Sequence, residues 1–97
     1  MVLMYDARFT KRFNKQFRKL DKQIQREILK EIEKLRQNLE LGDPLKGNLS
    51  DFSKLRIKDY RVIYKTHSPE NVMEFAFVDH RKHVYEDLAR LRQEGVI

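Results

Sequence analysis

The sequence predicts an α+β fold, an antiparallel sheet with an N-terminal helical hairpin packed on one face and a short C-terminal helix. Apolar residues recur every three or four positions between residues 9 and 39, which indicates amphipathic helices. Between residues 52 and 78 they alternate with polar residues or form short runs, which indicates strands. At 97 residues the chain is expected to form one domain, spanning residues 1–97.

The N-terminal part is expected to form a short strand at Val2–Tyr5 and then two helices. The apolar stripe of the first helix consists of Phe9, Phe13, Phe17 and Leu20. Asp21 is the predicted N-cap of the second helix, because its carboxylate can accept hydrogen bonds from the first backbone N–H groups. The apolar stripe of this helix consists of Ile24, Ile28, Ile32, Leu35 and Leu39. With so short a connection, the two helices are expected to pack as an antiparallel hairpin.

The second half is expected to form the sheet. Glycine and proline at residues 42–48 end the helical pattern and mark an irregular connection. The predicted strands are Phe52–Lys58, Arg61–Thr66 and Val72–Val78. Asp59 and Tyr60 form the first turn between them and residues 67–71 the second, and helical spacing returns from Val84.

Composition limits the function classes. The net charge is +6 and the sequence pI is about 9.7, which favours a nucleic acid or an acidic protein as partner, although a well-solvated surface would also explain some of the excess. The chain has no cysteine, so it has no disulfide scaffold, thiolate nucleophile or zinc knuckle. It contains neither a signal peptide nor an apolar run of about 18 residues, so we expect a cytoplasmic protein without a membrane contact.

Two basic clusters are the candidate site. With a period of two, Lys54, Arg56 and Lys58 are expected on one strand face, with Arg61 close by on the antiparallel neighbour. Such cations could bind a phosphate, or they could only solvate a sheet surface. The predicted helices cover the opposite face, which would leave the basic face open.

The second cluster follows the last predicted strand and consists of His80, Arg81, Lys82, His83 and Tyr85. His80 and His83 have a spacing that two metal ligands can use, but a third firm ligand is missing and the neighbouring cations would repel a metal ion. We therefore predict no metal and no cofactor.

The sequence also lacks a nucleophile elbow, a glycine-rich phosphate loop and a carboxylate pair for glycoside chemistry. The remaining chemistry is metal-free cleavage of RNA by its own 2′-hydroxyl. That reaction needs a base, cations at the phosphorane and an acid for the leaving oxygen.

The order of the segments resembles the RelE branch of the RelE/ParE toxin superfamily over nearly the whole chain. The resemblance is most specific at Leu45–Gly47, Lys54–Tyr64 and His80–Tyr85. It implies a toxin of a type II toxin–antitoxin system, an endoribonuclease that cleaves mRNA on the ribosome. It also implies a cognate RelB-like, acidic antitoxin as partner.

Catalytic roles follow from the same resemblance. Lys54 and Arg56 match the basic pair that acts as base or phosphate clamp, and Arg61 matches the arginine that stabilises charge at the phosphate. Arg81 matches the candidate acid or leaving-group stabiliser, and Tyr85 the tyrosine that stacks on a base. Further RNA contacts are predicted for Lys58, His80, Lys82 and His83, where His83 is either an acid–base group or a surface residue.

The chain departs from the family pattern at Ser53 and Lys58, where an aromatic and a small residue are usual. Two other functions compete with the ribonuclease. One is a ParE-like inhibitor of DNA gyrase on the same fold, and the other is a basic nucleic-acid-binding module without catalysis. The retained cations and Tyr85 favour the ribonuclease.

Overall fold

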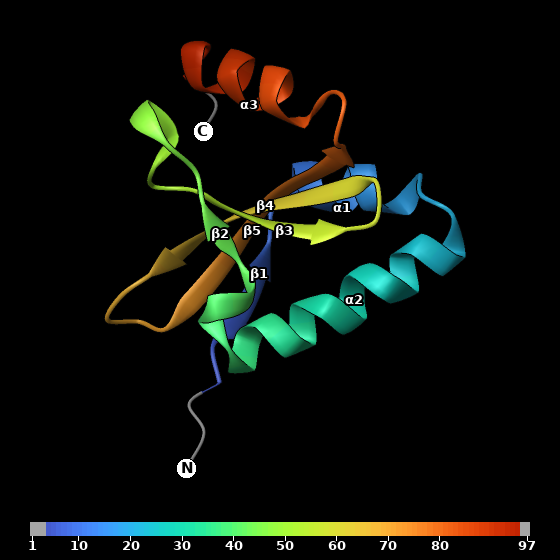
Figure 1. The fold of residues 1–97 in the computed structure, drawn as a ribbon, viewed down its shortest axis with the longest axis vertical. Helices are drawn as coiled ribbons and strands as arrows, with labels where there is room; N and C mark the ends of the chain where they lie inside the picture. The colour runs from blue at the N-terminus through green and yellow to red at the C-terminus, as the bar shows by residue number, and fades with distance from the viewer. Residues whose placement is uncertain (1–3, 96–97) are drawn as a thin grey trace.

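The computed structural model describes residues 4–95, which form a five-stranded sheet with helices on both faces (Figure 1). The elements in chain order are β1 (Asp6–Phe9), α1 (Lys11–Arg18), α2 (Lys22–Gln37), β2 (Asp43–Pro44), β3 (Ser53–Ile57), β4 (Tyr60–His67), β5 (Val72–His80) and α3 (Val84–Gln93). Short 3₁₀ turns cover Leu39–Leu41 and Gly47–Leu49. The strand order is β1-β5-β4-β3-β2, so the predicted α+β class is confirmed.

The N-terminal strand corrects two predictions. In the described part of the chain it begins at Asp6, and the start of the predicted strand at Val2–Tyr5 lies outside the described residues. It pairs with β5 in parallel, so the sheet is not wholly antiparallel. Phe9 ends this strand because Thr10 N-caps α1, accepting a hydrogen bond from the Phe13 N–H at 3.1 Å.

The hairpin of β3 and β4 was predicted with bounds that differ by one residue at each of the four strand ends. Its register places Arg56 opposite Arg61 and Lys54 opposite Ile63. The connection before it, predicted to be irregular, contains the two-residue strand β2, which pairs with the first residues of β3. Pro44 is tolerated there because β2 is an edge strand.

One face of the sheet is covered by α1 and α2, as predicted. The core on this side contains Phe13, Ile28, Ile32, Leu35, Leu55, Ile57, Val62, Tyr64, Met73, Phe75 and Val78. Most residues of the predicted apolar stripes therefore reach one core. The two outermost do not, because Phe9 belongs to β1 and Leu39 lies in the exposed 3₁₀ turn after α2. Asp21 caps α2 as predicted, accepting from the Gln23 N–H at 3.0 Å.

The opposite face is not open, and the prediction that it would be is wrong. The helix α3 lies over it, on the other side of the sheet from α2 (Figure 1). The core on this side contains Leu45, Phe52, Ile63, Ala76, Phe77, Val84, Leu88 and Leu91. The reason is that Ile63 and Phe77 present apolar surface on the basic face as well, and burial of that surface favours a covering helix. None of the helices in residues 4–95 is long and apolar enough to cross a membrane.

Candidate active site

The two basic clusters meet in one pocket of about 390 Å³ on the α3 side of the sheet. Its lining residues are Lys54, Arg56, Arg61, Arg81, Lys82 and Tyr85. Two of the cations lie on β3, one on β4, and the rest on the segment that joins β5 to α3. Residues that are 31 positions apart in the sequence, Lys54 and Tyr85, thus form one site.

The aromatic side of the pocket is formed by Tyr85. The preceding residue, Val84, is fully buried and fixes the first turn of α3 against the sheet. Tyr85 is 40% exposed, and the Lys54 Nζ lies 5.4 Å from the centre of its ring. This cation–π contact orients the ring beside the cations and leaves its other surface available to a ligand.

Arg61 is fixed by neutral partners. Its Nη1 donates to the carbonyl oxygens of Lys58 at 2.9 Å and of Tyr60 at 2.8 Å. Because carbonyl groups carry no net charge, the guanidinium keeps its full positive charge at a defined position. A phosphate in the pocket would meet a pre-positioned donor.

Two carboxylates that the sequence analysis did not assign pair with the other arginines. Arg81 donates its backbone N–H to the Asp59 carbonyl at 2.7 Å, and its Nε lies 3.5 Å from Asp59 Oδ1. The Arg56 Nε lies 3.8 Å from Asp43 Oδ2. All four side chains are more than half exposed, so both ion pairs are weak and an anion can compete with them.

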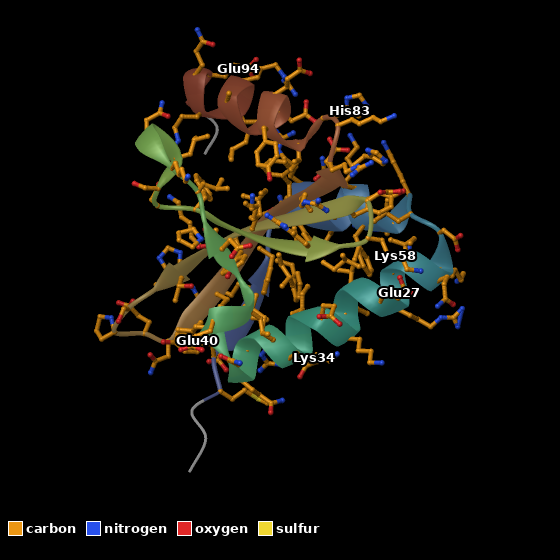
Figure 2. All side chains as sticks on the ribbon, in the orientation of Figure 1. Glu27, Lys34, Glu40, Lys58, His83 and Glu94 are labelled. Atoms are coloured by element: carbon orange, nitrogen blue, oxygen red, sulfur yellow. The ribbon has the colours of Figure 1, made fainter. Side chains whose placement is uncertain are left out.

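Lys58 does not share the face of Lys54 and Arg56, and that prediction is wrong. The strand β3 ends at Ile57, and Lys58 lies in the following turn with a φ of 53°. The period of two therefore stops before it. Its Nζ lies 3.0 Å from Glu27 Oε1 on α2. Figure 2 labels both side chains, which lie next to each other. The hydrogen bond from Lys58 lowers the pKa of the Glu27 carboxyl below its ordinary value.

Neither of the two predicted histidines lines the pocket. The His80 Nδ1 accepts from the Lys82 N–H at 3.2 Å, and its ring packs edge-on against Tyr60 at 5.6 Å between ring centres. His83 is exposed and directly precedes α3 (Figure 2). Within residues 4–95, no group of three or more His, Asp or Glu side chains could hold a metal ion.

Two carboxyl groups, those of Asp79 on β5 and Asp87 on α3, lie close to each other. Burial raises the pKa of the Asp79 carboxyl, and a hydrogen bond with the Asp87 carboxyl raises it further. Asp79 is also directly opposite Arg61 in the β4–β5 register. Its Oδ1 accepts from the His80 N–H at 2.7 Å, so this acidic group turns toward its own backbone.

The arrangement can bind a phosphodiester and a neighbouring base. Guanidinium groups donate to phosphate oxygens bidentately, an ammonium adds a point charge, and the Tyr85 ring can stack on a base. The pocket collects five cationic side chains around one phenol, which is the chemistry expected for stabilising a pentacoordinate phosphorane.

Comparison with known proteins gives the family. The model of the ParE toxin of type II toxin–antitoxin systems (parDE) matches residues 7–85. A search of the curated proteins finds no match.

Among solved structures, the chain is similar to one from the RelBE2 toxin–antitoxin complex of Mycobacterium tuberculosis, with 26% identity and a TM-score of 0.74 over 80% of this chain and 99% of that chain. It is also similar to one from the RelB–RelE antitoxin–toxin complex of Methanococcus jannaschii, with 25% identity and a TM-score of 0.67 over 82% and 96%. A mutant of the E. coli toxin RelE in the free state shares the fold, with 21% identity and a TM-score of 0.74 over 90% and 96%. The chain therefore belongs to the ParE toxin family of type II toxin–antitoxin systems, and it is a RelE-like toxin within the RelE/ParE superfamily.

Proposed function

We propose that this toxin is a metal-free endoribonuclease that cleaves mRNA on the ribosome. The observation that supports the proposal is the pocket itself, in which five cationic side chains surround the exposed ring of Tyr85. A protein that acted only by covering a partner's surface would not need this convergence of phosphate donors and a base-stacking ring.

In the proposed reaction, the 2′-hydroxyl oxygen of the RNA attacks the adjacent phosphorus and the bond to the 5′-oxygen breaks. The proton of the 2′-hydroxyl goes to a base, for which Lys54 and Arg56 are both candidates. A second proton reaches the leaving 5′-oxygen, with Arg81 as donor or stabiliser. Arg61 stabilises the negative charge on the phosphorane. Tyr85 stacks on a nucleobase of the RNA and thereby positions the 2′-hydroxyl.

Of the other predicted RNA contacts, Lys82 lines the pocket and is a further phosphate ligand in this proposal. The remaining three, Lys58, His80 and His83, lie outside the pocket, so we assign them no catalytic step. Contacts between these side chains and RNA stay a prediction.

The partner that controls the toxin is proposed to be an acidic, RelB-like antitoxin. The support is that similar chains from M. tuberculosis and M. jannaschii come from complexes with antitoxins. An acidic segment that orders on binding would complement the charge of the pocket and exclude RNA from it.

The second candidate function is inhibition of DNA gyrase, which the match to the ParE family model favours. This function requires binding and no cleavage. Assays of supercoiling and of mRNA cleavage separate the two functions. A ParE-like inhibitor would block supercoiling while ribosome-bound mRNA stays intact.

The experiment is cleavage of an mRNA paused on purified ribosomes, mapped by primer extension. We expect cuts within the codon in the ribosomal A site for the wild type and a loss of about 10²-fold or more for Arg81→Ala and Tyr85→Ala. Arg26→Ala on the exposed side of α2 is the matched control and should cleave like the wild type. Intact mRNA with folded wild-type protein and active ribosomes would reject the proposal, and a block of supercoiling would then support the gyrase inhibitor.

A further inference from the structure

The helix α1 exposes a strongly basic surface that the pocket does not use. Residues 8–22 contain seven Lys and Arg against a single acid, Asp21. All seven cations are exposed, and the helix buries only Phe13 completely. Four of them form what we call the α1 stripe, which consists of Lys11, Arg12, Lys15 and Lys19.

The α1 stripe is free of ion pairs in the described residues, since every salt bridge within residues 4–95 involves other cations. The helix α2 has the same cation spacing at Arg26, Lys30 and Lys34, but acids lie between them. Lys34 there lies 3.2 Å from Glu31. The two helices thus have the same spacing of cations, but only in α2 do acidic side chains lie between them.

Helix stability does not explain the stripe. Like charges four residues apart repel one another, and Lys11 and Arg12 lie at the N-terminal end, where the helix dipole disfavours cations. The first turn of α1 contains no acid that would offset this. Lys15 lies in the last turn, where the dipole favours a cation, so the dipole explains only part of the stripe. Because the stripe destabilises the free protein, we expect an anionic partner to bind it and offset the repulsion among its cations.

The shape of the surface suits an extended polyanion. The stripe and Gln16 line a shallow pocket of about 390 Å³. From Lys11 to Lys19 the helix rises by about 12 Å, which is longer than one phosphate group and matches a run of phosphodiester backbone.

Its position is fixed relative to the active site. The Thr10 hydroxyl donates to the Ala76 carbonyl at 2.6 Å, and the Val78 N–H donates to Gln16 Oε1 at 3.2 Å. These bonds attach α1 to the second half of β5, beyond the residues that pair with β1. Arg81 and Lys82 of the pocket follow directly after β5. The stripe and the pocket are therefore attached to the same end of one strand.

We propose that the α1 stripe is a second RNA-binding surface, which contacts the phosphate backbone of ribosomal RNA while the pocket holds the mRNA. The proposal rests on the ribosome-dependent function proposed above and names the additional partner of the site. RNA fits better than an acidic protein segment, because the stripe offers a periodic row of cations and, among residues 4–95, no apolar side chain lines its pocket.

The test compares two triple variants that remove equal charge from equal helical geometry. One is Lys11→Gln/Lys15→Gln/Lys19→Gln in α1 and its C-cap, and the control is Arg26→Gln/Lys30→Gln/Lys34→Gln in α2. Glutamine is as good a helix former as lysine and all six positions are exposed, so both variants should fold, which circular dichroism checks.

Equilibrium binding to purified ribosomes is measured between about 50 mM and about 200 mM salt. The α1 variant should reduce the slope of log K against log salt by about 2–3, and the α2 control should leave it nearly unchanged. In cleavage assays the α1 variant should need more ribosomes for half-maximal rate and reach the wild-type rate at saturation.

Equal salt slopes for the two variants would overturn the inference, even if the wild type cleaves mRNA. Unchanged ribosome binding together with weaker binding of the purified antitoxin by the α1 variant would also overturn it, in favour of an acidic protein. The reverse case is separable: a wild type that never cleaves but binds ribosomes through the α1 stripe would support the inference and reject the proposed nuclease.

Discussion

At the residue scale, two arginines that face each other across the pocket favour anion binding and cost stability in the free protein. Arg56 and Arg61 are directly opposite in the β3–β4 register, and like charges in that position destabilise a sheet. Arg61 is fixed by two carbonyl groups, whereas Arg56 is 62% exposed and, among residues 4–95, has only the distant Asp43 as an ion-pair partner. An anion that enters between the two guanidinium groups would relieve this repulsion.

We therefore expect Arg56→Gln to stabilise the protein and weaken its function. The free energy of unfolding should rise by about 0.2–1 kcal/mol, because the repulsion with Arg61 disappears. Cleavage of ribosome-bound mRNA should fall by about 10²-fold, the effect of removing one transition-state donor. Urea unfolding and single-turnover cleavage measure the two effects. Lys30→Gln, which removes an exposed cation from α2, is the control and should change neither; a destabilised Arg56→Gln would contradict the argument.

At the scale of the elements, the residues of the pocket could be predicted because each depends on a short stretch of sequence. Alternation places Lys54 and Arg56 on one strand face, and a tight turn brings Arg61 opposite Arg56. Lys58 could not be placed this way, because it has a positive φ of 53° in the turn and so breaks the alternation. No local sequence pattern predicts that conformation at a lysine.

Contacts between distant segments were also beyond the sequence. The parallel pairing of β1 with β5 joins residues that are 66 positions apart, as in Asp6 and Val72, and alternation carries no information about the partner of a strand. The covering of the basic face by α3 depends on the apolar side chains of Ile63 and Phe77. In the sequence pattern, the basic residues of the same face hide this apolar surface. The carboxylates Asp43 and Asp59 do not line the pocket, and only the folded chain brings them beside its arginines, Arg56 and Arg81.

The helix α3 is anchored at its C-terminal end by Asp51. Arg92 donates to both carboxylate oxygens of Asp51, at 2.6 and 2.8 Å, and Lys65 lies 3.2 Å away. Both cations also lie over the ring of Phe52. The hydrogen bond from Arg92 lowers the pKa of the Asp51 carboxyl. A lowered pKa means that the carboxylate contributes stability above the unfolded pKa and loses it as the pH falls through the folded value.

Asp51→Asn should accordingly destabilise the protein at neutral pH and not in acid. We expect a loss of about 1 kcal/mol near neutrality, the upper range for a partly exposed ion pair. The difference from the wild type should shrink as the pH falls below the ordinary value of 3.8. Urea unfolding over this range measures it, with Glu70→Gln in the exposed turn before β5 as control. A difference that stays constant with pH would exclude the ionic contribution.

Asp79, at the other end of α3, should behave with the opposite sign. Because burial and the nearby Asp87 raise the pKa of its carboxyl, the folded state binds its proton more tightly than the unfolded chain. Stability should then fall as the pH rises from the ordinary value toward the raised one. Asp79→Asn removes the charge and keeps an oxygen that can accept from His80 N–H.

This variant should be more stable than the wild type at neutral pH by roughly 0.5 kcal/mol, with no advantage in acid. Unfolding of Asp79→Asn, Asp87→Asn and the double variant forms a thermodynamic cycle. We expect clear coupling between the two substitutions, because either one abolishes the repulsion between the carboxylates. Additive effects would show that the two groups do not interact.

At the scale of the whole molecule, charge is concentrated where partners are proposed to bind. The net charge of +6 arises mainly from the N-terminal third and from residues 41–65, whereas residues 66–97 carry more acids than Lys and Arg. Pocket and α1 stripe lie on opposite faces of the sheet but near the same end of β5, so cations are concentrated on the side of the molecule where β5 ends. An acidic antitoxin would be steered to that side by long-range attraction.

Association with the antitoxin should therefore be fast and strongly dependent on salt. At low salt we expect an association rate constant of about 10⁸ M⁻¹s⁻¹ or more, which should fall toward about 10⁵–10⁶ M⁻¹s⁻¹ as salt screens the charges. Stopped-flow mixing of the purified proteins measures this dependence.

The double variant Arg56→Gln/Arg61→Gln should lower the association rate constant at low salt. At high salt it should converge with the wild type, because steering acts only where charges are unscreened. The double variant Lys30→Gln/Lys34→Gln removes equal charge from α2, where acids lie alongside, and should have a smaller effect. Equal effects of the two double variants would mean that only the net charge of the toxin attracts the antitoxin, and that the pocket is not its docking surface.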